Sequence, residues 1–235
     1  MNVVSIMAHQ DDEMRCLGTM LKCKVRGDRL FFITLTDGAS GFVQSPTIDP
    51  KDAGRIRHAE MSALAKALAA DLINLREPDE FLYDTREVRR ALIEAIRKTG
   101  AELVFTHHAQ DYNLDHTTTS ALVRHCAMHS SLPVLPTESR PLARHPAVFM
   151  VEPHGPFHFP ATHFVDVGDY EQEKVSLLQC HRSQEEAMTR TLGTGFDKLS
   201  RRPDSYWGQQ AGCDYAECFA PMPARGAMKP YPVLP

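Results

Sequence analysis

The chain has 235 residues, of which 43% are hydrophobic and 24% charged, and its formal net charge is -4. This length can bury a real core, and the slightly acidic balance excludes a polycationic surface for nucleic acid or anionic lipid. The N-terminal apolar run is too short for a signal peptide or a membrane span, and it lacks a basic segment. Six scattered cysteines without a CxxC pair are typical of reduced thiols. We therefore expect a cytoplasmic protein without a membrane span.

Apolar runs and amphipathic segments alternate through the first two thirds of the chain. The expected strands are residues 2–8, 29–36, 71–75, 102–106 and 147–151. The expected helices are residues 14–25, 53–70, 85–99 and 117–128. Strands that alternate with helices of this length are typical of a parallel, doubly wound α/β sheet. No composition shift marks a boundary, so we predict a single domain over residues 1–235.

The pattern becomes less regular in the last third of the chain. Residues 131–146 contain four prolines and are expected to form an irregular excursion. A further strand is expected at residues 162–167 and a helix at residues 170–190. From about residue 200 we expect an irregular C-terminal tail.

One imidazole and three carboxylates crowd together directly after the first expected strand. The segment 8–13 reads Ala-His-Gln-Asp-Asp-Glu and contains His9, Asp11, Asp12 and Glu13. Acids grouped in this way repel one another and are costly to desolvate unless a cation lies among them. The pattern therefore favours a metal site at the end of a strand, and the alternative is a charged turn on the surface.

A second cluster of His and Asp residues follows the strand at 102–106. The segment 107–116 reads His-His-Ala-Gln-Asp-Tyr-Asn-Leu-Asp-His. In open α/β sheets, ligands bind outside the carboxyl ends of the strands. Because parallel strands bring their carboxyl ends to one edge, we expect His9 and the second cluster to meet there.

Two histidines and one carboxylate then form the predicted metal site. His9 and Asp12 are three residues apart in a tight turn, and His116 adds a remote third ligand. This set with one open position is typical of catalytic zinc, although Fe²⁺ or Co²⁺ can occupy a mixed site of this kind. Asp11 can take the proton of a metal-bound water. The alternatives are a helix-terminal His116 without metal and Asp11 as a turn residue or N-cap.

These motifs resemble those of the zinc-dependent de-N-acetylases of the N-acetylglucosaminyl-phosphatidylinositol deacetylase superfamily, the LmbE-like proteins. The first hallmark is residues 8–13, with Gln10 where the family usually has proline, and the second is residues 108–116. The similarity continues, in chain order, through residues 35–38, 57–60, 174–184 and 215–219. It therefore extends over nearly the whole chain.

The resemblance implies a Rossmann-like α/β fold with a mainly parallel sheet and helices on both faces. It implies His9, Asp12 and His116 as ligands of one zinc ion and Asp11 as the general base. Family members remove an N-acetyl group from an amino sugar or glycoconjugate. Asp11 would deprotonate the zinc water that attacks the amide, and the ion would stabilise the oxyanion.

Three further roles come from the resemblance alone, and each has an alternative. Asn113 stands where many members have a histidine, and it polarises the carbonyl or caps the following helix. Arg57 matches an arginine near the substrate, or it pairs with Glu60 on the helix surface. Asp79 faces sugar hydroxyls or is a solvated loop residue.

Other functions are compatible with parts of this pattern. An amidase acting on a non-sugar or thiol-conjugate amide would use the same machinery, and a non-catalytic Rossmann-like binding protein would need a degenerate metal site. A dinucleotide-dependent oxidoreductase is disfavoured because no GxGxxG follows the first strand. The predicted partner is a small amino-sugar or glycoconjugate substrate, and a homo-oligomer is compatible with the sequence. The sequence assigns no role in catalysis to four further histidines, His154, His158, His163 and His181.

Overall fold

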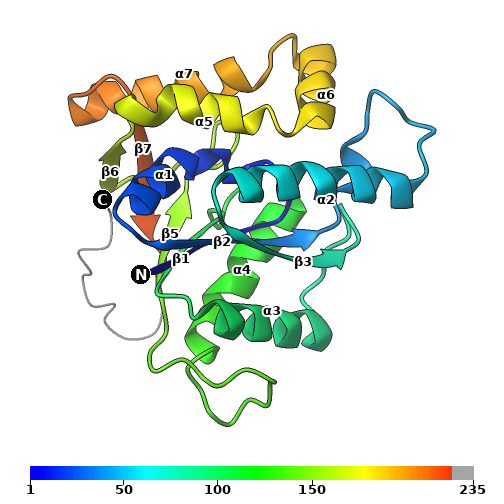
Figure 1. Cartoon of the computed structure of the whole chain (residues 1–235), viewed down its shortest axis with the longest axis vertical. Helices are drawn as coiled ribbons and strands as arrows, with labels where there is room; N and C mark the ends of the chain where they lie inside the picture. The colour runs from blue at the N-terminus through cyan, green and yellow to red at the C-terminus, as the bar shows by residue number, and fades with distance from the viewer. Residues whose placement is uncertain (224–235) are drawn as a thin grey trace.

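The computed structural model describes residues 1–223, which build one seven-stranded sheet in the order β3-β2-β1-β4-β5-β7-β6 (Figure 1). The first five strands in this order are parallel to one another, whereas β7 is antiparallel to both of its neighbours. The strands are β1 (Asn2–Met7), β2 (Arg29–Thr36), β3 (Asp71–Glu77), β4 (Leu103–Thr106), β5 (Ala147–Val151), β6 (His163–Asp166) and β7 (Ala216–Pro221).

Helices connect the strands and cover both faces of the sheet. The α-helices are α1 (Leu17–Val25), α2 (Pro50–Ala67), α3 (Arg86–Thr99), α4 (Leu114–His129), α5 (Glu171–Leu178), α6 (Arg182–Leu192) and α7 (Phe196–Ala211). Three short 3-10 helices, η1 (Asp12–Arg15), η2 (Ala39–Gly41) and η3 (Gly168–Tyr170), lie in the loops. In Figure 1, α1 and α2 lie on one side of the sheet with α5, α6 and α7 beyond them, and α3 and α4 lie on the other. The predicted fold class, a mainly parallel α/β sheet with helices on both faces, is confirmed.

Two apolar cores flank the sheet because the buried strands present large side chains to both faces. On the α1 and α2 face, Phe32 and Phe105 pack with residues of α5 and α7. On the opposite face, Ile6 and Val104 pack with the apolar sides of α3 and α4. Within residues 1–223, no helix is both long and apolar enough to cross a membrane.

The single helix predicted at residues 170–190 is wrong, because the chain breaks there into α5 and α6. His181 leaves the helical region with φ -80° and ψ 59°, and its ring is fully buried. The break lets His181 Nε2 reach Glu13 Oε1 at 2.6 Å, beneath the loop that follows β1. A helical pattern in the sequence cannot show this break, since it depends on a partner 168 residues away.

The irregular tail predicted from about residue 200 is also wrong for the residues that the structure describes. Residues 196–211 form α7, and β7 then inserts between β5 and β6. The buried face of α7 consists of residues spaced four apart: Phe196, Ser200, Asp204 and Gly208. Only the first of these is a large apolar residue. The apolar periodicity that marks a helix is therefore missing from the sequence. The part of the predicted tail at 224–235 lies outside the described residues.

Candidate metal centre and active site

The two polar clusters meet where the strand order reverses. β1 and β4 are neighbours in the sheet, with Ile6 in register with Thr106, and their helical crossovers run to opposite sides. His9 follows β1 by two residues, and His107 follows β4 directly. Ligands of doubly wound sheets bind at this switch point. The predicted convergence of the two loops is confirmed.

Three side chains from these loops form a group that can hold a metal ion. His9 Nδ1 lies 3.1 Å from His116 Nε2 and 3.2 Å from Asp12 Oδ2, and His116 Nε2 lies 3.3 Å from Asp12 Oδ1. One ligand atom from each residue lies within 4.8 Å of the others. Two imidazoles and one carboxylate fit a divalent ion that keeps an open position.

Carboxylates behind the two histidines set which ring nitrogen faces the ligand group. Asp111 Oδ1 lies 3.1 Å from His116 Nδ1, which leaves Nε2 for a metal. Asp79 Oδ1 and Asp115 Oδ2 lie 3.0 Å and 3.4 Å from His9 Nε2, which leaves Nδ1. Such partners fix the tautomer and raise the basicity of ligand histidines. Sequence reasoning missed Asp111 and Asp115 as supports, although both stand in the second cluster.

Burial and the neighbouring charges shift the pKa values of these residues. Burial alone would lower the pKa of His9, but the carboxylates of Asp115 and Asp12 raise it well above its usual value. Burial also opposes the protonation of His116, whose pKa nevertheless rises to about 9 because Asp12 is close. Burial would raise the pKa of Asp12, but His116 and His107 hold it well below its usual range. Burial, followed by repulsion from His116, lowers the pKa of His107 to about 4.

We expect metal affinity to increase with pH up to about 9, because a metal must displace the protons that the carboxylates hold on the imidazoles. Below a ligand's metal-free pKa, each displaced proton changes the affinity about tenfold per pH unit. From pH 6 to pH 8 the affinity for Zn²⁺ should therefore rise about 100-fold or more. Calorimetric titration in two buffers of different ionisation enthalpy measures the protons released. An affinity independent of pH would contradict this electrostatic account.

Asp11 is held in a strained conformation beside the ligand group. Its backbone angles, φ of 108° and ψ of -19°, lie in a left-handed region that residues other than glycine rarely adopt. Its backbone N–H donates to Glu13 Oε2 at 2.9 Å, and the same glutamate binds the buried His181. Arg57 Nη2 donates to Asp11 Oδ1 at 3.0 Å. Burial raises the pKa of Asp11, although the positive charge of Arg57 opposes the shift.

Arg57 is a buried member of the site and not a surface ion-pair residue. Its Nη2 also donates to the carbonyl oxygen of Gln10, while Nε and Nη1 are buried without a hydrogen-bond partner among the described residues. Glu60, the partner considered from sequence, binds the backbone N–H and Oγ of Ser183 at 2.8 Å and 2.7 Å. Gln10 Nε2 donates to Thr36 O at 3.1 Å, a hydrogen bond to β2 that the family's usual proline cannot make.

Asn113 is the N-cap of α4. Its Oδ1 accepts from the backbone N–H groups of Asp115 at 2.7 Å and His116 at 3.4 Å, which satisfies the first turn of the helix. Its Nδ2 donates to Glu80 Oε1 at 3.1 Å. Of the two roles that the sequence leaves open for Asn113, these contacts correspond to capping, and they hold His116 at the start of α4.

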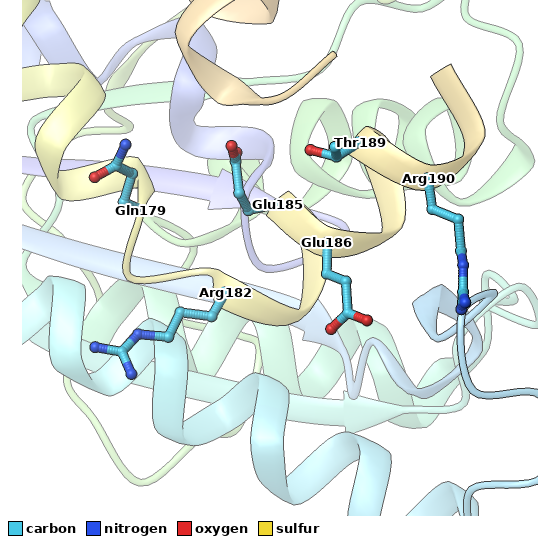
Figure 2. Close-up of a pocket in the computed structure, with 6 residues that line it drawn as sticks. All are labelled: Gln179, Arg182, Glu185, Glu186, Thr189 and Arg190. Atoms are coloured by element: carbon cyan, nitrogen blue, oxygen red, sulfur yellow. The ribbon is translucent and has the colours of Figure 1, made fainter. Parts of the chain in front are cut away.

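A hollow of about 440 Å³ on the surface of α6 does not belong to this centre (Figure 2). Its wall consists of side chains from the end of α5 and from α6, and none of them is a member of the His/Asp group: Gln179, Arg182, Glu185, Glu186, Thr189 and Arg190. The hollow and the His/Asp group at the strand ends are therefore separate features of the structure.

Comparison with known proteins identifies the family. Residues 4–127, which are 124 of the 235 residues, match the family model described as PIG-L, GlcNAc-PI de-N-acetylase. This chain belongs to that family. It is therefore an enzyme of the N-deacetylase class, and both polar clusters lie within the matched residues.

Solved structures with the same fold extend over nearly the whole chain. The N,N'-diacetylchitobiose deacetylase from Pyrococcus horikoshii has a TM-score of 0.81 at 23% identity, over 94% of this chain and 83% of that one. The conserved protein TT1542 from Thermus thermophilus has a TM-score of 0.79 at 25% identity, over 97% of both chains. GalB, the 4-carboxy-2-hydroxymuconate hydratase from Pseudomonas putida, has a TM-score of 0.79 at 17% identity, over 98% of this chain and all of that one. These likenesses concern the fold, which hosts more than one reaction.

Proposed function

We propose that this N-deacetylase removes an N-acetyl group from an amino sugar or glycoconjugate at a zinc ion bound by His9, Asp12 and His116. The observation that carries the proposal is the convergence of these three ligand atoms within 4.8 Å in a member of a de-N-acetylase family. When bound, a zinc ion would supply an acidified water and polarise the amide carbonyl. Fe²⁺ or Co²⁺ can serve the same donor set.

Asp11 carries the protons of the reaction in this proposal. Arg57 binds Oδ1, so Oδ2 is the oxygen that we assign to proton transfer. A carboxylate with a raised pKa can take a proton from the attacking water and return it to the leaving amine nitrogen. The amide C–N bond breaks, and the products are acetate and the free amine.

Two further residues orient the reaction partners in this proposal. Arg57 holds Asp11 through the hydrogen bond from Nη2 to Oδ1, and we propose that it does so from a position next to the substrate. For Asp79 we propose the support of His9 in place of a sugar contact, because Ser40 N donates to its Oδ2 at 2.8 Å and its Oδ1 faces His9.

The extent of the functional unit and its surroundings are also proposals. We propose that residues 1–235 form one deacetylase domain that acts on a small-molecule substrate. The cytoplasmic location and a homo-oligomeric state stay predictions from the sequence.

Metal analysis combined with a substrate panel tests the proposed function. We expect about one zinc per chain after loading and removal of the excess, and amine release from N-acetylglucosamine, N,N'-diacetylchitobiose or an N-acetylglucosaminide. Chelation should abolish the release, and added zinc should restore it. Release only from non-sugar amides would favour the amidase alternative. A chain that binds no metal would contradict the metal-dependent mechanism.

A further inference from the structure

The carbonyl oxygen becomes negative in the transition state of amide hydrolysis, and a hydrogen-bond donor at this oxygen adds to the stabilisation that a metal would supply. Asn113 is the sequence candidate for that donor, but its amide is oriented by other groups. Its Oδ1 caps α4 by accepting from the backbone N–H groups of Asp115 and His116, and its Nδ2 donates to Glu80. A side chain held in this way by a helix start cannot turn toward the substrate without breaking the cap.

His154 stands at the same edge of the sheet with no assigned role. It follows β5 by three residues, and β5 is the parallel neighbour of β4, so its carboxyl end lies beside the second cluster. The ring centroid of His154 lies 6.1 Å from that of His116. The side chain is half-buried, which is the exposure expected of a group that lines a substrate site and still reaches solvent.

An arginine fixes the tautomer of His154. Arg15 Nη2 lies 3.1 Å from His154 Nδ1. A guanidinium has no lone pair to offer and donates its protons, so Nδ1 must be the acceptor and Nε2 must carry the ring proton. Arg15 is in turn held by Glu152, with 3.6 Å between Nη1 and Oε2, and only 11% of its side chain is exposed.

Arg15 also connects His154 to the ligand group along the chain. Arg15 is also the last residue of η1, which begins with Asp12, so one short helix carries both a ligand and the residue that orients His154. Arg15 thus fixes the tautomer of a histidine that lies next to His116, and a donor held in one state by its surroundings is what catalytic preorganisation requires.

We propose that His154 Nε2–H donates to the carbonyl oxygen of the scissile amide and that Arg15 is the positioning residue that keeps the proton on Nε2. This inference rests on the proposed deacetylation. As water adds to the carbonyl carbon, Asp11 takes its proton, and the C=O electron pair moves onto the oxygen that His154 contacts. His154 transfers no proton. When the C=O bond reforms, the C–N bond breaks and the proton of Asp11 passes to the amine nitrogen.

Kinetics of paired variants test the donor. His154→Ala should lower kcat for the best substrate of the panel by about 100- to 1,000-fold, with KM changed less than about threefold and full zinc content. His154→Gln, which keeps an N–H donor, should recover part of that loss. The matched control is His158→Ala, an exposed histidine of the same loop, which should behave as wild type. An active wild type whose His154→Ala variant is equally active, or whose Asn113→Ser variant shows the kcat loss instead, would overturn the inference.

The tautomer is tested without turnover. In ¹⁵N-labelled, metal-free protein at neutral pH, the nitrogen shifts of His154 should show a protonated Nε2 and a bare Nδ1. Arg15→Gln should shift the ring toward a mixture of tautomers and lower kcat, whereas Arg15→Lys, which still donates, should retain the wild-type tautomer. A proton found on Nδ1 would overturn the assignment. A wild type that binds zinc but releases no amine from any substrate would overturn the proposed function and the donor role with it.

Discussion

Replacing Asp11 by asparagine is expected to leave the metal in place and to lower kcat by about 100- to 10,000-fold, the usual contribution of a general base. Asparagine has the same shape, and its Oδ1 can still accept the hydrogen bond from Arg57. It cannot take a proton from water, so the attacking nucleophile is no longer generated. Zinc content per chain and the rate of amine release are the two measurements.

A matched substitution separates this effect from a general change of charge. Asp49 is the N-cap of α2, and Asp49→Asn replaces one good cap by another away from the site. That variant should keep its activity within about twofold and its stability within about 0.5 kcal/mol. Asp11→Asn with full zinc content and near-normal turnover would contradict the base role.

The meeting of the two polar clusters was predictable because its signal is local. Each polar cluster follows a buried strand directly, and parallel strands have only one edge at which their carboxyl ends can meet. His9 and His116 therefore come together although 107 residues separate them. The same reasoning does not extend to Asp79, whose contact with His9 depends on how the loop after β3 folds over the sheet.

The elements that the sequence misassigned share a physical cause. The break between α5 and α6 and the buried face of α7 involve polar side chains that are paired inside the molecule. A pattern read from apolar residues assigns such positions to the surface, because buried charges are rare unless they are paired. His181, Asp204 and Glu217 are buried in this way, and their partners come from distant parts of the chain.

Lys174 is the centre of the largest of these buried pairings, and Lys174→Met is expected to destabilise the protein by about 3–5 kcal/mol. Its ammonium group is fully buried and contacts Asp204 of α7 and, at 2.8 Å, Glu217 of β7. Glu217 also accepts from the backbone N–H groups of Gly18 at 2.8 Å and Thr19 at 2.7 Å, at the start of α1. Without the lysine, two buried carboxylates lose their cation.

Urea unfolding of Lys174→Met should therefore show a clearly lower midpoint with a similar slope. The control is Lys198→Met on the exposed side of α7, which should change stability by less than about 0.5 kcal/mol.

Adding Asp204→Asn to Lys174→Met removes one uncompensated charge and should restore part of the loss, because the cost lies in the unpaired carboxylates. If Lys174→Met were as stable as Lys198→Met, the pairing would not hold α1, α7 and β7 together. α1 follows the loop that carries His9 and Asp12, so a loss of stability there should also weaken zinc binding.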